Sequence, residues 1–198
     1  MQSFAGMTLN HTRLLPLAVT LLLTLAACGE EEKKFQMKAE GGSEDSFPEF
    51  TTQLLGPDPL ALVTCSEDPT PGIADDERKL CLRIHLDATG LSAAGAPATL
   101  SISGEAQLAE AVGPAAASFT AREGHSPVVT TAWVTVGCFS QPRQGPFTQQ
   151  LQGRLELEEN TSKRLAGRVV LTGEGQLAVI DCGNVNFADF DFRFDVAR

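Results

Sequence analysis

The chain has 198 residues, with 15 basic and 25 acidic side chains and a formal net charge of −10. Such an acidic chain repels polyanions, which argues against nucleic acid as a partner and against electrostatic binding to anionic lipid. The sequence contains no HExxH zinc motif, no GxSxG nucleophile elbow and no glycine-rich phosphate loop. We therefore predict no catalytic residue and no cofactor, and we expect that the protein is not an enzyme.

The first element is a short apolar segment. Arg13 precedes Leu14–Ala27, which has 14 residues and no charge, whereas about 20 residues are needed to span a bilayer. A basic residue followed by a short apolar run predicts a signal peptide over residues 1–27. The segment ends in Leu25-Ala26-Ala27-Cys28. This sequence resembles the lipobox of bacterial lipoproteins, in which an aliphatic residue and two small residues precede a lipidated cysteine.

The resemblance implies a membrane anchor on Cys28. In that family the cysteine thiol is joined to a diacylglycerol, the peptide is cleaved before it, and many bacteria also acylate the new amine. Two or three acyl chains hold a protein stably at a membrane, because each buried methylene contributes about 0.8 kcal/mol. Gly29 is not the aspartate that retains some lipoproteins in the inner membrane, which favours the outer membrane. The alternatives are an ordinary signal peptide followed by a chance cysteine, and an uncleaved helix.

Cleavage before Cys28 would leave 14 basic and 25 acidic side chains, a formal charge of −11. The next segment, residues 28–49, is dense in Glu, Lys, Gly and Ser and poor in branched apolar residues. Such a composition buries too little apolar surface to offset the loss of chain entropy. It predicts a flexible acidic tether, with the folded domain over residues 50–198.

From residue 50 onward, short alternating runs are separated by Gly, Pro and polar turns, which predicts an antiparallel β domain. The runs Leu80–Asp87, Leu151–Glu158 and Leu165–Leu171 alternate apolar and polar residues, and the last two flank a polar turn and predict a hairpin. The apolar run Val128–Val136 predicts a central strand buried on both faces, with Trp133 packed there.

The C-terminal run alternates three phenylalanines and a valine with Asp and Arg, so we expect it to dock in the core: Phe190, Phe192, Phe194 and Val196. About seven to nine strands without a long helix predict an all-β fold, an antiparallel β-sandwich. A short helix is an alternative at Ala106–Val112, where Ala and Glu weaken the strand pattern.

Four cysteines follow Cys28, and an even number in an exported protein predicts two disulfides, with three possible pairings. We favour Cys65–Cys81, because the 15 residues between them form a polar loop with two prolines and a glycine. That choice leaves Cys138–Cys182. The alternative, a four-thiolate zinc site, lacks CxxC spacing.

A candidate ligand-binding trio lies on the polar face of one predicted strand. Arg83, His85 and Asp87 take alternate positions, so their side chains would point the same way at about 7 Å spacing. An acid–base or ligand-binding site can be built in this way, but an exposed polar strand face has the same pattern. The corresponding enzymatic alternative is a hydrolase that uses His85 and Asp87.

A candidate calcium site is formed by Asp181, Asn184 and Asn186, whose oxygens flank a glycine. The spacing is not that of an EF-hand loop, and Asp, Asn and Gly also build ordinary turns. The sequence therefore predicts no metal site, with calcium as the alternative.

These features predict a membrane-anchored lipoprotein of the bacterial cell envelope, with its domain in the periplasm or at the cell surface. Its β-sandwich would bind an unidentified protein or glycan partner, or have a structural role. The alternative is a small-ligand or calcium-dependent carbohydrate-binding module, which rests on analogy with other sandwiches.

Overall fold

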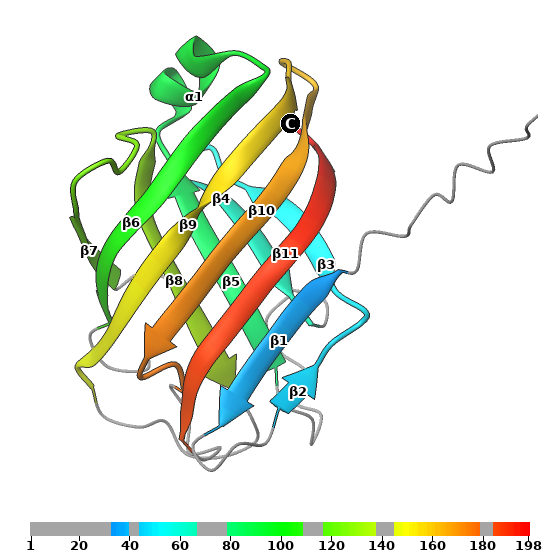
Figure 1. Ribbon diagram of the computed structural model, residues 1–198. Helices are drawn as coiled ribbons and strands as arrows, with labels where there is room; N and C mark the ends of the chain where they lie inside the picture. Colours follow the sequence, from blue (N-terminus) through cyan, green and yellow to red (C-terminus); the bar gives the residue numbers. More distant parts are fainter. Residues whose placement is uncertain (1–32, 40–43, 67–78, 109–116, 138–144, 179–183) are drawn as a thin grey trace, which may run out of the picture. The chain divides into compact units, whose positions relative to one another are not determined.

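The computed structural model of the chain describes residues 33–39, 44–66, 79–108, 117–137, 145–178 and 184–198 (Figure 1). These residues belong to one compact unit, Glu32–Arg198. The elements are β1 (Lys34–Ala39), β2 (Glu44–Ser46), β3 (Thr51–Leu55), β4 (Leu60–Cys65), β5 (Lys79–Leu86), α1 (Ala88–Ala94), β6 (Ala98–Leu108), β7 (Ala117–Ala121), β8 (Val129–Gly137), β9 (Phe147–Asn160), β10 (Arg164–Gly175) and β11 (Val185–Ala197).

The strands form two antiparallel sheets. The larger has seven strands in the order β2-β1-β11-β10-β9-β6-β7, and the smaller has four in the order β3-β4-β5-β8. Figure 1 shows the larger sheet in front of the smaller one, and both contribute side chains to one hydrophobic core. The predicted antiparallel β-sandwich is confirmed, with eleven strands in the described residues rather than the expected seven to nine. Within the described ranges, no helix is long and apolar enough to cross a membrane.

The predicted tether over residues 28–49 is wrong where β1 and β2 form. In β1, Phe35 and Met37 are 0% and 1% exposed, and the strand pairs with β11 along its whole length. The Phe35 ring contacts Phe50 and Phe190 at centroid distances of 4.9 and 5.0 Å. Two large apolar residues at alternate positions thus suffice to fix a strand on an available sheet edge, although the average composition is polar.

The position of the strand β8 in its sheet also differs from the prediction. It was expected to be central, but it ends the strand order of the four-stranded sheet. Its inward residues Ala132, Val134 and Val136 are buried in the core. Trp133 pairs in register with Arg83 and is also buried, at 2% exposure, in the same hydrophobic cluster. The middle of the run is therefore buried, with Trp133 packed as expected, although the strand lies at the edge of its sheet.

The free edge of β8 is closed by a side chain of β9 and by the segment that follows β10. The Gln149 side chain of β9 is fully buried; its Oε1 accepts from the Val134 amide at 2.9 Å, and its Nε2 donates to the Val134 carbonyl at 2.6 Å. The Val136 amide donates to the Leu177 carbonyl at 3.0 Å. These bonds satisfy backbone groups that would otherwise be left at an open edge.

The C-terminal strand and the hairpin agree with the sequence prediction. The alternate residues of β11, from Phe190 to Val196, are buried, and β9 pairs with β10 across a short turn. The terminal Arg198 side chain donates to Asn160 Oδ1 at 2.6 Å and to Ser92 Oγ at 3.0 Å. These two bonds tie the end of β11 to the β9–β10 hairpin and to α1.

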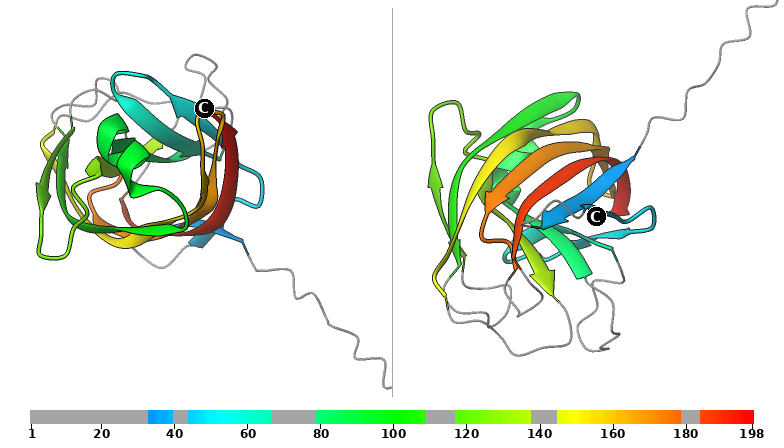
Figure 2. Two further views of the ribbon diagram at one scale, coloured as in Figure 1. Left: turned by 90° about the horizontal axis from the view of Figure 1, so that it is seen from above. Right: turned by 60° about the horizontal axis from the view of Figure 1, so that its bottom comes forward.

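The helix α1 lies over one end of the sandwich, between the two sheets (Figure 2, left). Its Leu91 side chain is fully buried in the core. The helix was not predicted at this position. The alternative helix at Ala106–Val112 is wrong for Ala106 and Leu108, which lie in β6; the rest of that range is outside the described residues.

Candidate functional site

The candidate site is the outward face of the four-stranded sheet. Strand register arranges its side chains in three rows of four, one from each strand: Thr51, Cys65, Cys81 and Thr135; Gln53, Val63, Arg83 and Trp133; Leu55, Ala61, His85 and Thr131. We call these twelve positions the outer face. The intervening residues, such as Leu62 and Leu82, point into the core. Directly paired positions lie about 4.5–5.5 Å apart and diagonal ones about 7–8 Å apart.

The outer face is free of acidic side chains. None of its twelve described positions is Asp or Glu, although the chain has 25 acidic residues. The seven-stranded sheet differs, because its strands carry ion pairs such as Arg168–Asp191 at 2.6 Å and Arg193–Glu158. The outer face is therefore the least negative sheet surface in the described part of this acidic protein.

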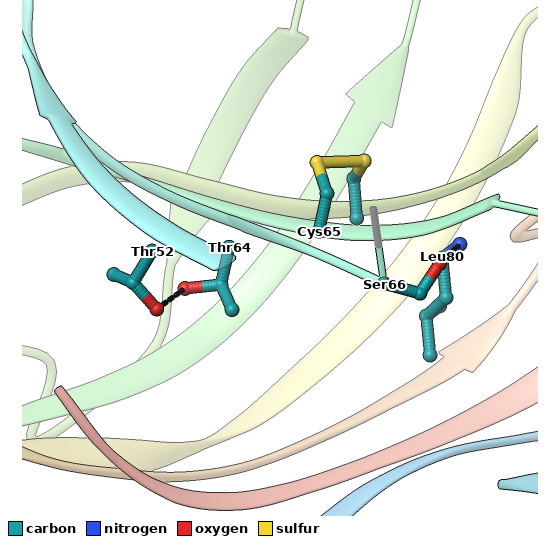
Figure 3. The surroundings of a disulfide bond; sticks show 6 residues. Thr52, Thr64, Cys65, Ser66 and Leu80 are labelled. Carbon is teal, nitrogen blue, oxygen red and sulfur yellow. Dashed lines mark hydrogen bonds between the residues drawn. A yellow bond between two sulfur atoms is a disulfide. The ribbon is translucent and has the colours of Figure 1, made fainter. Parts of the chain in front are cut away.

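A disulfide joins the two cysteines of the outer face, as predicted. Cys65 and Cys81 pair directly across β4 and β5, with 4.1 Å between their Cα atoms. Figure 3 shows the bond on the opposite side of the sheet from Thr64 and Leu80. On that side the Thr64 hydroxyl lies 3.0 Å from the Thr52 hydroxyl.

The backbone also holds the ends of the loop that this disulfide closes. The Ser66 amide donates to the Leu80 carbonyl at 2.9 Å, and the Leu80 amide donates to Ser66 Oγ at 3.0 Å (Figure 3). The second predicted pair, Cys138–Cys182, lies outside the described residues. Cys28, the predicted lipidation site, also lies outside them.

Arg83 lies near the middle of the outer face. Its side chain is partly buried and makes no hydrogen bond or ion pair with any residue that the structure describes. Its direct neighbours across the sheet are Val63 and Trp133. Burial lowers the pKa of the Arg83 guanidinium, because a low-dielectric surrounding disfavours the charged form. The group remains a cation at neutral pH, since arginine titrates far above that range.

His85 lies two residues further along β5 and contacts the same tryptophan. The imidazole meets the Trp133 indole edge-on, with 4.7 Å between ring centroids, and Trp133 is only 2% exposed. Burial lowers the pKa of His85, and the positive charge of Arg83 lowers it further. His85 is therefore neutral at pH 7, because its ordinary pKa is already about 6.5.

Thr131 pairs with His85 across β5 and β8. Its Oγ1 is buried and has no hydrogen-bond partner among the described residues. Buried hydroxyls are nearly always paired in folded proteins. The outer face thus brings together an unpaired cation, a neutral imidazole and an unpaired hydroxyl.

Asp87 does not join Arg83 and His85, so the predicted trio is corrected to a pair. The strand β5 ends at Leu86, and Asp87 is the N-cap residue of α1. Its carboxylate accepts a hydrogen bond from the Gly90 amide. The alternation therefore stops one residue before Asp87, because the chain turns into the helix there.

Two of the three residues of the calcium alternative line a separate pocket. Asn184 and Asn186 border a pocket of about 310 Å³ together with Phe147, Gly175, Gln176, Ala178 and Val185. Asp181 is outside the described residues. Within the described ranges, no group of three His, Cys, Asp or Glu side chains is placed to hold a metal ion.

Sequence reasoning missed the two site residues on β8. Trp133 was expected to pack in the core, where it lies, but its contact with His85 was not predicted, and Thr131 was not singled out. The register between β5 and β8 brings both beside Arg83 and His85, and no local sequence pattern encodes that register.

No protein-family model, curated protein or solved structure matches the chain.

Proposed function

We propose that this protein is a lipid-anchored lipoprotein of the bacterial cell envelope whose β-sandwich is a non-catalytic binding domain. The observation that carries the proposal is the order of Arg13, the apolar run Leu14–Ala27 and the lipobox that ends in Cys28. The disulfide Cys65–Cys81 supports it, because disulfides persist in exported proteins and are rare in the cytosol.

The position of β1 changes what such an anchor would do. The first strand begins at Lys34, six residues after Cys28, and six extended residues span at most about 21 Å. A tether through residue 49 would instead reach about 75 Å. An anchor on Cys28 therefore holds the sandwich close to the membrane surface rather than far from it.

The geometry around His85 favours binding over hydrolysis. Asp87 accepts a hydrogen bond from Gly90, and no carboxylate among the described residues pairs with His85. An acid–base mechanism needs an oriented partner within hydrogen-bond reach. The outer face instead offers a cation and a neutral imidazole, which are ligand-binding groups.

The anchor is tested by metabolic labelling with a tagged palmitate in a Gram-negative host. The full chain should incorporate the label, and Cys28→Ala should lose it and accumulate unprocessed precursor. Thr24→Ala, a change within the apolar run that leaves the lipobox intact, is the matched control and should label normally. Label that persists in Cys28→Ala rules out this lipidation site.

A further inference from the structure

We propose that the outer face binds a monocarboxylate, held by the guanidinium of Arg83 with Thr131 and His85 beside it. The inference rests on the proposed function, because it names the ligand class of that binding domain. It is carried by the unpaired Arg83, by the unpaired Thr131 hydroxyl and by the absence of acidic side chains from the outer face.

The other sheet shows what an arginine of this chain does when a carboxylate is in reach. Arg168 holds Asp191 with two parallel bonds, from Nε to Oδ1 at 2.6 Å and from Nη2 to Oδ2 at 3.0 Å. Such a bidentate pair matches the planar fork of the guanidinium to the two carboxylate oxygens. Arg83 presents the same fork with no described partner. A partly buried cation without a counter-ion favours an anion from outside the chain.

Charge balance selects a monovalent ligand. Arg83 supplies one positive charge, and His85 is neutral at pH 7 because burial and Arg83 both lower its pKa. A single carboxylate neutralises the site, whereas a phosphate dianion would leave one negative charge uncompensated. Across the sheet the neighbours of Arg83 are Val63 and Trp133, and along β5 the disulfide lies next to it. Val63 and Trp133 are 0% and 2% exposed, so the half-buried Arg83 and His85, rather than these apolar side chains, are the groups that a ligand would meet.

Two further groups can hold the ligand. Thr131 lies diagonal to Arg83 and directly opposite His85, so these three side chains fall within about 8 Å of one another. The Thr131 hydroxyl is a donor without a described acceptor, and neutral imidazole also carries one donor nitrogen. No acidic side chain of the outer face competes for these donors.

The fluorescence of Trp133 can be used to measure ligand binding at this site. Trp133 is the only tryptophan in the chain, which has no tyrosine, and it is the cross-strand neighbour of Arg83. Its fluorescence, excited at the red edge of indole absorption, therefore reports on this site alone. The experiment titrates the full chain in mild detergent at pH 7.5 and constant ionic strength with hexanoate, its neutral analogue hexanamide, and inorganic phosphate.

We expect a saturable change with hexanoate. Arg83→Gln should weaken binding about 10- to 100-fold, the usual effect of losing hydrogen bonds to a charged group. Arg154→Gln is the matched control, because Arg154 pairs with Glu156 on the other sheet, and its affinity for hexanoate should equal that of the unchanged chain. Thr131→Val, which keeps the shape and removes the hydroxyl, should weaken binding several-fold, and it tests the site even if Arg83→Gln does not fold.

Three results would overturn the inference: no response to hexanoate, hexanamide binding as tightly as hexanoate, or phosphate binding more tightly than hexanoate. Equal hexanoate affinity of the unchanged chain and of folded Arg83→Gln would also overturn it. The palmitate labelling of Cys28 does not depend on Arg83. Normal labelling with no hexanoate response therefore rejects the ligand class alone, whereas loss of labelling rejects the anchor.

Discussion

The Gln149 side chain forms hydrogen bonds with the backbone at the edge of β8, as a neighbouring strand does elsewhere in the sheet. Its amide oxygen accepts from the Val134 amide and its amide nitrogen donates to the Val134 carbonyl, and the nitrogen also donates to the Gln176 carbonyl at 3.1 Å. A carboxamide is suited to this role because it carries both an acceptor and donors. Alternation with Phe147 and Leu151 places Gln149 on the inward face of β9 and Gln152 on the outward face, but its partner on β8 could not be predicted, because no local pattern encodes how the two sheets pack.

The Gln149→Leu substitution should therefore be strongly destabilising. It leaves the amide and carbonyl of Val134 buried without partners, at about 1–3 kcal/mol for each group, so we expect a loss of roughly 2–5 kcal/mol in the free energy of unfolding. Urea unfolding measures it. Gln152→Leu is the control, since Gln152 is exposed and should change stability by less than about 0.5 kcal/mol. Equal losses for the two variants would contradict the role of Gln149.

His85 makes stability depend on pH in the weakly acidic range. Its pKa in the folded protein lies below the unfolded value of about 6.5, so the unfolded chain binds more protons as the pH falls. The free energy of unfolding should therefore decrease as the pH drops through about 6.5 and should level off below the folded pKa. The groups that face His85 across the sheet, Ala61 and Thr131, are uncharged, which leaves Arg83 as the neighbouring charge on the outer face.

Urea unfolding at pH values from 8 to 5 measures this effect. His85→Gln should remove the part of the pH dependence that lies near pH 6.5, and Arg83→Gln should reduce it, because one of its two causes is then gone. A His85→Gln variant with the pH dependence of the unchanged chain would show that His85 is not the group responsible.

At the scale of elements, strict alternation predicted the strands that pack one face on the core. β5, β9, β10 and β11 all follow that pattern over eight or more residues. β1 was missed because its six residues carry only two large apolar side chains within a polar segment. α1 was missed because Gly90 and Ser92 are weak helix formers, and because Asp87 was assigned to the preceding strand rather than to a helix cap.

The role of β1 is tested by comparing its two faces. Phe35→Ala should cost about 3–5 kcal/mol in unfolding free energy, because Phe35 is fully buried among Phe50, Phe190 and Phe192. Lys38→Ala on the exposed face of the same strand is the control and should have little effect. If Phe35→Ala were as mild as Lys38→Ala in urea unfolding, this segment would be the flexible tether that its composition predicts.

At the scale of the whole molecule, the two sheets share one core but differ in the charged side chains that they carry. The inner faces form one core, the strands of the larger sheet carry ion pairs, and the outer face of the smaller sheet is free of acids. The sequence predicted Arg83 and His85 together because they share a strand. Thr131 and Trp133 could not be placed beside them, since that requires the register between strands more than 40 residues apart.

The proposed lipid anchor on Cys28 lies a short distance before β1. Mass spectrometry of the N-terminal peptide, from the protein extracted from membranes of a Gram-negative host, tests it most directly. We predict that the mature chain begins at Cys28 and that its first residue carries a diacylglycerol, with or without a third acyl chain. A mature chain that begins at another residue, or an unmodified Cys28, would rule out the proposed anchor.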